Sequence, residues 1–117
     1  MDAETIREYC ISKKGTEESM PFGEDTLVFK VMGKMFLLMN LEGDLSINLK
    51  CDPVKAISLR ETYPAVLPGY HMNKTHWNTV MIDGSIPERE IHAWIDQSYD
   101  LVVISLTKIK HKEWEKL

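Results

Sequence analysis

The sequence predicts an α+β domain in which a helix is followed by three strands, a second helix, two further strands and a long C-terminal helix. Three strand-like segments follow one another between residues 26 and 50 and are separated only by short turns. Two of these segments have apolar residues at every second position. An Asp-Pro pair then opens a helical segment, and apolar residues recur at helical spacing from residue 91 onward. Because strands joined by short turns pair antiparallel, we expect two layers: an antiparallel sheet of about five strands with the C-terminal helix packed on it.

The chain has 117 residues, of which 44% are hydrophobic and 27% charged, and its net charge is −4. This is the composition of one globular domain spanning residues 1–117, and it excludes a strongly cationic nucleic-acid or membrane binder. The longest apolar run covers residues 35–39, whereas a membrane span needs about twenty residues. The first residues lack the apolar core of a signal peptide, and the two cysteines form no disulfide pattern. We therefore expect a cytoplasmic protein with no membrane partner.

The N-terminal helix is expected over residues 2–13, because Asp2 is a favourable N-cap and one helical face is apolar. That face carries Ile6, Tyr9 and Cys10. Gly15 ends the helix. Residues 16–25 are then expected to form a polar loop with two apolar anchors, Met20 and Phe22.

Residues 26–31, 34–40 and 45–50 are expected to form a three-stranded antiparallel meander, with Gly33 and Gly43 in its turns. The run over residues 34–40 is mostly apolar, which is typical of a strand covered on one face and partly on the other. In the other two strands, the side chains expected to face the core are Leu27, Phe29, Val31, Leu45, Ile47 and Leu49.

A second helix is predicted to start at Asp52 and Pro53, the residue types favoured at the N-cap and the first helical position. It should end near residue 62, before Pro64. A short apolar stretch at residues 65–67 and a segment at residues 77–82 supply the last two strands.

The final helix is expected to open around Pro87, capped by Ser85 or a neighbouring residue, and to be the longest element at roughly twenty residues. The charged tail from residue 108 onward is expected to fray. The apolar stripe of this helix comprises Ile91, Trp94, Ile95, Ser98, Leu101, Val102, Ser105, Leu106 and Ile109.

The segment from Pro68 to Trp77 concentrates polar side chains that suit contacts with phosphates, bases or acidic groups. These are His71, Asn73, Lys74 and His76. The alternative is a long connection held by its own side chains, with Asn73 bonded to the local backbone. We expect Trp77 to pack inward, Lys74 to reach solvent, His76 to be structural, and His71 to be partly exposed.

The sequence offers no catalytic arrangement, and we expect no enzyme activity and no cofactor. Cys10 lies on an apolar helix face, and Cys51 precedes a helix N-terminus, where the thiol pKa can be lowered; both are expected to be structural. His92 and Asp96 are spaced for two metal ligands on one helix, but no third ligand is placed by spacing. We therefore expect no metal site and a solvated His92.

Charge is unevenly distributed along the chain. Residues 27–82 carry six Lys or Arg and four Asp or Glu, so this part is locally basic within an acidic chain. Lys50, Lys55 and Arg60 are the candidates for contacts with DNA phosphates, together with the polar segment between Pro68 and Trp77. The alternative is a solvated sheet face on which lysines discourage edge-to-edge pairing.

Several segments resemble the MmcQ/YjbR family over nearly the whole chain. They are Thr16–Gly23 (TEESMPFG), Val31–Phe36 (VMGKMF), Asp52-Pro53 and Pro68–Val80 (PGYHMNKTHWNTV), the last being the most specific. The resemblance implies an α-β(3)-α-β(2)-α fold like that of type III secretion chaperones and CyaY-like domains. It also implies DNA binding through a double-wing arrangement, although the family supplies no catalytic residues.

Three functions are therefore open, of which the last in rank is an enzyme or small-ligand binder that uses His71 and His76. The first is weak, non-specific DNA binding through the basic and polar residues named above. The second is a non-catalytic, chaperone-like module that binds a protein or peptide on an exposed sheet face or helix groove. An exposed apolar patch would favour the second function, and a continuous basic face would favour the first.

Overall fold

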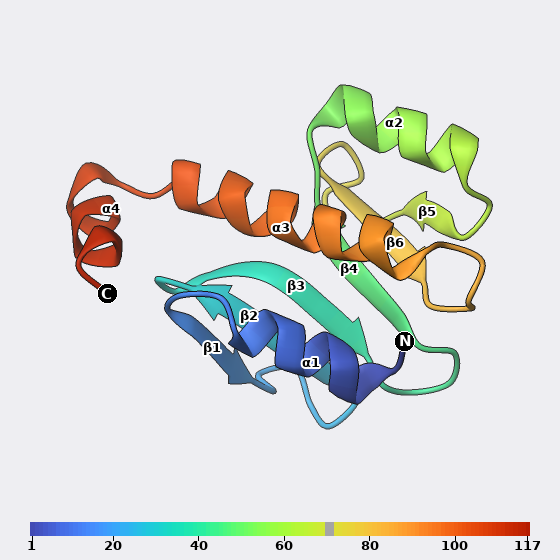
Figure 1. Ribbon diagram of the computed structural model, residues 1–117, viewed down its shortest axis with the longest axis horizontal. Coiled ribbons are helices and arrows are strands. Elements are labelled where there is room, and N and C mark those ends of the chain that lie inside the picture. Colours follow the sequence, from blue (N-terminus) through green and yellow to red (C-terminus); the bar gives the residue numbers. More distant parts are fainter. Residues whose placement is uncertain (70–71) are drawn as a thin grey trace.

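The computed structural model describes residues 1–69 and 72–117 and confirms the α+β class. Its sheet is antiparallel, with the strand order β1-β2-β3-β4-β6-β5 (Figure 1). The strands are β1 (Thr16–Ser19), β2 (Thr26–Val31), β3 (Lys34–Asn40), β4 (Ser46–Lys50), β5 (Val66–Pro68) and β6 (Trp77–Met81). The helices are α1 (Ala3–Ile11), α2 (Pro53–Thr62), α3 (Glu88–Ile104) and α4 (Lys108–Glu115).

Strand β1 was not expected, because the segment TEES has no apolar residue and reads as a loop. It forms by backbone pairing with β2 along the sheet edge, where Thr16 lies opposite Val31 and Ser19 opposite Val28. The Arg7 side chain on α1 adds two hydrogen bonds to the Glu18 carboxylate, the Nε–Oε2 bond being 2.7 Å long. The sheet therefore has six strands rather than five.

Strands β2 and β3 join through Met32 and Gly33, whose φ angles of +50° and +82° suit a two-residue hairpin turn. Further along this pair the register shifts, because Phe29 lies opposite Leu37 while Lys30 lies opposite Met35. Phe36 is thus the extra residue of a β-bulge. Phe36 and Leu37 both enter the main core, whereas Leu38 packs on the opposite face.

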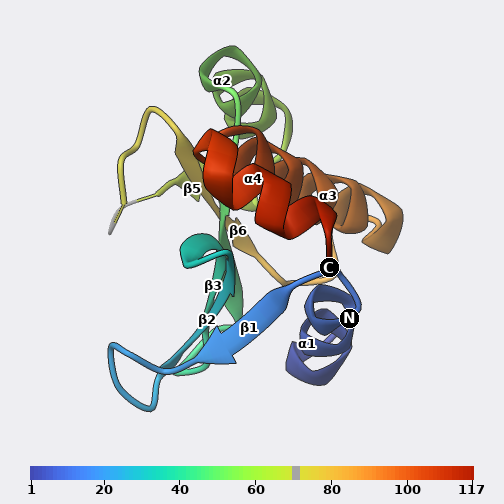
Figure 2. The same ribbon diagram turned by 90° about the vertical axis from the view of Figure 1, so that its left-hand side faces the viewer.

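The helices pack on one face of the sheet, which we call the covered face (Figure 2). Six of the predicted core positions are confirmed, because Phe29, Ile47, Leu49, Trp94, Ile95 and Val102 are buried. Leu27, Leu45 and Leu101 were also expected to be buried but are only half-buried. The α3 residue Trp94 meets Tyr63 edge-to-face at 5.2 Å between ring centroids. Helix α1 joins the same layer through the Tyr9 hydroxyl, which donates to Asp96 of α3 at 2.7 Å.

The C-terminal helix is shorter than predicted. Helix α3 begins after Pro87 without a side-chain cap, because Ser85 instead donates to Asp83 in the preceding turn. It ends at Ile104, and Thr107 caps a separate helix, α4, in place of the expected frayed tail. Ile109 consequently leaves the apolar stripe and is 73% exposed.

Helix α4 returns to the body of the domain through Trp114, whose indole N–H donates to the Tyr99 hydroxyl at 2.9 Å. The Lys14 ammonium lies 4.1 Å from the centre of the Trp114 ring. In the described part of the chain, no helix is long and apolar enough to cross a membrane.

Candidate functional site

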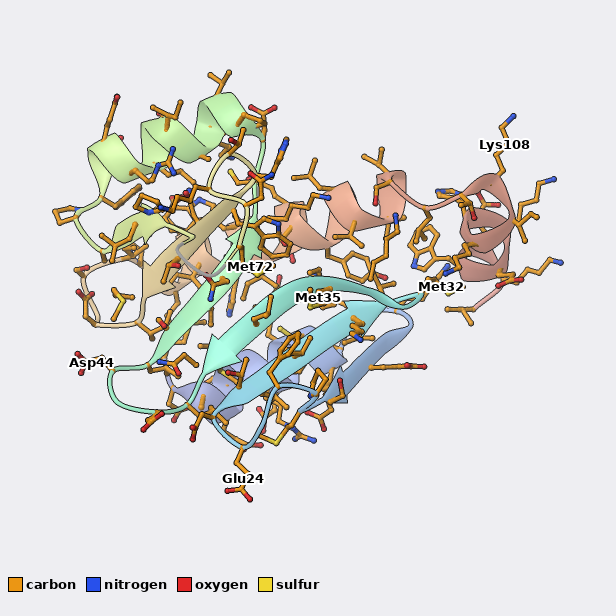
Figure 3. The ribbon with its side chains drawn as sticks, turned by 180° about the vertical axis from the view of Figure 1, so that it is seen from behind. Glu24, Met32, Met35, Asp44, Met72 and Lys108 are labelled. Carbon is orange, nitrogen blue, oxygen red and sulfur yellow. The ribbon has the colours of Figure 1, made fainter. Side chains whose placement is uncertain are left out.

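The face of the sheet opposite the helices, which we call the open face, is the candidate site. Two connections project on this side: the β1–β2 loop and the β5–β6 connection (Figure 2). Figure 3 looks onto this face and shows Met35 of β3 and Met72 of the β5–β6 connection lying on it. The two connections flank a sheet surface that the helices leave uncovered.

A groove of about 620 Å³ lies on the open face. Its lining is Phe22, Thr26, Leu38, Asn40, Ser46, Asn48, Leu67, Met72, Thr79 and Met81. These residues come from strands β2, β3, β4, β6 and β5 and from both flanking connections. Half of these lining residues are apolar, and the other half carry hydroxyl or amide groups. Within residues 1–69 and 72–117, no charged residue lines the groove.

A small apolar cluster supports this groove. Val28, Leu38 and Trp77 are buried together on the open face, and Met35 and Met72 pack against them. Trp77 is 9% exposed, so the prediction that it packs inward is confirmed. This apolar cluster is separate from the main hydrophobic core, because it lies on the side of the sheet opposite the helices.

The β1–β2 loop differs from the prediction. Met20 and Phe22 were expected to anchor it, yet they are 43% and 66% exposed. The loop is held by backbone bonds instead, such as that from the Leu41 N–H to the Asp25 carbonyl at 2.8 Å. Phe22 therefore presents its ring at the groove rather than to a core.

Three of the polar side chains that line the groove are held by hydrogen bonds within the protein. The Thr79 hydroxyl donates to Asn48 Oδ1 at 2.6 Å across the β4–β6 pair. Asn40 Nδ2 donates to the Glu42 carbonyl at 2.8 Å in the turn before β4. Their orientation is thus set before any ligand arrives, which lowers the entropy cost of binding.

The β5–β6 connection is pinned at its base. The Gly69 N–H donates to the Trp77 carbonyl at 3.0 Å, and the Asn73 carbonyl accepts from the backbone N–H groups of His76 and Trp77. Asn73 Oδ1 accepts from the Thr75 N–H at 2.9 Å, which confirms the predicted local bond. His76 was expected to be structural but is exposed, because the turn is closed by backbone and Asn73 bonds. The expectation for His71 lies outside the described residues.

The structure brings together two of the predicted cations. Arg60 Nη1 donates to the Lys74 carbonyl at 3.1 Å, and both residues line a second groove of about 330 Å³ beside α2. Lys55 turns away and donates to Gln97 of α3 at 2.7 Å. Lys50 is half-buried on β4, opposite Trp77.

The remaining chemical candidates are structural. Burial raises the pKa of the Cys10 thiol to about 12, and burial also raises the pKa of Cys51. His92 was expected to be solvated, but its ring stacks on Tyr9 at 4.0 Å between centroids. Asp96 was paired with His92 as a possible metal ligand, but its carboxylate accepts hydrogen bonds from Tyr9 and Lys13. Within residues 1–69 and 72–117, no three His, Cys, Asp or Glu side chains are grouped to hold a metal ion.

Most residues that line the groove on the open face were not predicted as site residues from the sequence. The alternation of β4 places Ser46 and Asn48 on the polar face, but it does not indicate which strand lies beside them. The usable signal was the apolar run over residues 34–40, which predicted partial cover on a second face. Leu38 supplies that part of the groove.

The chain is similar to known proteins over most of its length. It is 40% identical over 110 residues to YbdF of Escherichia coli O157:H7, covering 93% of this chain and 90% of the relative. It is 34% identical over 113 residues to YjbR of Escherichia coli strain K12, covering 96% of each.

Two solved structures also match. The crystal structure of Deinococcus radiodurans protein DR2400, a DUF419 domain, has a TM-score of 0.90 and 36% identity, covering 96% of this chain and 86% of that one. A crystal structure of a Pseudomonas syringae protein has a TM-score of 0.77 and 31% identity, covering 86% of this chain and 98% of that one. The YjbR family model matches residues 11–101, and the chain therefore belongs to the YjbR family.

Proposed function

We propose that the chain is a non-catalytic binding module that holds an extended, uncharged peptide segment of another protein on its open face. The observation that carries this proposal is the groove of about 620 Å³, whose lining within residues 1–69 and 72–117 is apolar, hydroxyl and amide but not charged. A charged ligand entering such a groove would lose hydration without gaining an opposite charge. An uncharged segment meets no such penalty.

The dimensions of the groove favour an extended peptide. Its lining residues come from five neighbouring strands, β2, β3, β4, β6 and β5. Adjacent strands lie about 4.8 Å apart, so the lining spans about 19 Å. An extended chain rises about 3.3 Å per residue, so roughly six residues would cross it.

The β1–β2 loop adds to this support. Phe22 leaves 66% of its surface in water, and covering an aromatic ring is favourable. Phe22 lies in the segment Thr16–Gly23, and Met72 and Thr79 lie in Pro68–Val80. The two longest segments that carry the family resemblance therefore meet at one groove.

The test is fluorescence anisotropy with labelled hexapeptides in three sets: uncharged, acidic and basic. We expect binding from the uncharged set. Phe22→Glu should weaken it at least about tenfold, because it places a carboxylate in the groove and removes the ring. Leu41→Glu is the matched control: Leu41 is also an exposed loop residue, at 40%, but does not line the groove.

Two results would contradict the proposal. One is an absence of binding by every uncharged peptide. The other is equal loss of binding in the Phe22 and Leu41 variants, which would indicate a general effect of negative charge.

A second candidate is weak, non-specific DNA binding, favoured by the meeting of Arg60 and Lys74 at one groove. With three or four phosphate contacts, a plot of log affinity against log salt should have a slope of roughly −3 to −4. Lys74→Ala should reduce that slope by about one. A titration without binding to any duplex at low salt would remove this candidate.

A further inference from the structure

We propose that the chain has a second binding site, for a carboxylate carried on an apolar group, between α2 and the turn at residues 73–75. We call it the α2 groove, and its lining is Pro53, Ile57, Arg60, Pro68, Lys74 and Thr75. It does not depend on the peptide proposal, because none of the described residues lines both this groove and the groove on the open face.

Two cations line this groove. Arg60 is half-buried in the last turn of α2, and Lys74 extends from the facing turn. Among the described residues, Arg60 forms no ion pair, and no acidic side chain lines the groove. A guanidinium presents its donors as a planar fork that fits the two oxygens of a carboxylate, and the neighbouring ammonium adds a second positive charge.

The Arg60 guanidinium is fixed relative to the turn that carries Lys74. Arg60 Nη1 donates to the Lys74 carbonyl at 3.1 Å, so the guanidinium is tied to the backbone that carries the lysine. Asn73 closes the same turn through its side-chain bond to the Thr75 N–H at 2.9 Å. An acidic ligand would therefore meet a guanidinium that is already positioned beside the lysine-bearing turn, which lowers the ordering cost of binding.

Three of the other four described lining residues of the α2 groove are apolar, and the fourth, Thr75, carries a hydroxyl group. Pro53, Ile57 and Pro68 supply its hydrocarbon surface, and Ile57 is 51% exposed. The volume of about 330 Å³ is at the small end of ligand pockets. An acid with a short apolar body fits this combination better than a fully hydrated polyanion. Such an acid could be a free organic acid or the carboxyl terminus of a peptide that ends in an apolar residue.

The experiment is a titration of the ¹⁵N-labelled full chain followed by amide chemical shifts. The probes are hexanoate, hexanamide, N-acetyl-leucine, N-acetyl-leucinamide, inorganic phosphate and a short DNA duplex. We expect the two carboxylates to shift the amide signals of residues 57–60 and 73–75, and the two amides to leave them unchanged. Tenfold tighter binding of N-acetyl-leucine than hexanoate would identify the peptide terminus as the source, and the reverse would identify a free acid.

Matched variants test the cations. Lys74→Gln should weaken carboxylate binding at least about tenfold while leaving the Arg60 bond to the Lys74 carbonyl in place. Lys55→Gln removes the same charge from α2 but outside the groove, because Lys55 bonds Gln97, and should leave binding unchanged.

A second pair of variants tests the apolar surface. Ile57→Ser should weaken hexanoate binding several-fold. Val54→Ser, at a residue of the same helix that is 78% exposed and outside the groove, should not.

The proposal is overturned by any of three results. Hexanamide could bind as well as hexanoate, so that the charge has no role. Lys55→Gln could weaken binding as much as Lys74→Gln, so that only net charge matters. Phosphate or duplex alone could shift the signals, so that the groove binds phosphates. Phe22→Glu should leave hexanoate binding intact, which separates this test from that of the peptide groove.

Discussion

The two faces of the sheet are built from the same strands but differ in chemistry. On the covered face, Phe29, Phe36 and Ile47 are completely buried under the helices. On the open face, a smaller apolar cluster around Leu38 and Trp77 supports a groove that also carries hydroxyl and amide groups. Because alternate residues of one strand point to opposite faces, a single segment supplies both surfaces. We therefore expect the covered face to supply most of the folding free energy, whereas the proposed peptide contact lies on the open face.

The largest effect is expected for Trp94→Ala on the covered face. Trp94 is 5% exposed and packs edge-to-face against Tyr63, so its removal leaves a large cavity. The free energy of unfolding should fall by about 3–5 kcal/mol, measured by urea denaturation. Ile104→Ala, at an α3 residue that is 76% exposed, is the control and should change stability little. A small loss at Trp94 would show that the covered face does not dominate stability.

Two neighbouring leucines of β3 lie on opposite faces of the sheet. Leu37 is 0% exposed in the main core, whereas Leu38 is 6% exposed beside the open groove. Leu37→Ala should cost about 4 kcal/mol, and Leu38→Ala about 2 kcal/mol, because the wall of an open groove can collapse or admit water. Chemical denaturation of both variants measures the difference. Equal losses would mean that the two faces contribute equally to stability.

A smaller effect is expected at the rim of the covered face, where Asp96 joins α1 to α3. Partial burial raises the pKa of Asp96, but hydrogen bonds from Lys13 and Tyr9 outweigh it and hold that pKa below its ordinary value of 3.8. The carboxylate therefore stabilises the fold above its unfolded pKa, and this contribution is lost as the pH falls through the lower, folded pKa.

Asp96→Asn tests this contribution. The Asp96 side chain is 44% exposed, so solvent screening keeps its contribution below about 1 kcal/mol near neutral pH. The stability gap between wild type and variant should narrow as the pH falls below about 4. Unfolding curves at a series of pH values would measure the gap, and a constant gap would exclude the ionised carboxylate as the cause.

The parts of the fold that were predictable are those with periodic side chains. The alternation of Ile47 and Leu49 and the helical spacing of Trp94, Ile95 and Val102 each indicate a buried face, and all of these residues are buried. Strand β1 was not predictable from its residues, because its pairing with β2 is made by the backbone. The end of α3 was missed because Ile109 continues the spacing, while Thr107 is a weaker local signal for a new helix start.

The candidate sites were less predictable because they depend on which strands are neighbours. Asn48 and Thr79 are bonded across β4 and β6, although α2 and β5 lie between those strands in the sequence. The partners of the basic residues on α2 were equally unpredictable from the sequence. Lys55 and Arg60 are five residues apart on one helix, yet the first bonds α3 and the second bonds the β5–β6 connection.

The bulge at Phe36 determines how strand β3 would respond to the loss of one residue. In a regular strand, adding or deleting one residue exchanges the two faces of everything beyond it. Here the extra residue is absorbed at Phe36, so that Met35 and Leu38 stay on the open face while Phe36 and Leu37 share the covered one. Deletion of Phe36 would thus remove a ring from the core, but Leu37 would stay on the covered face and Met35 and Leu38 on the open face.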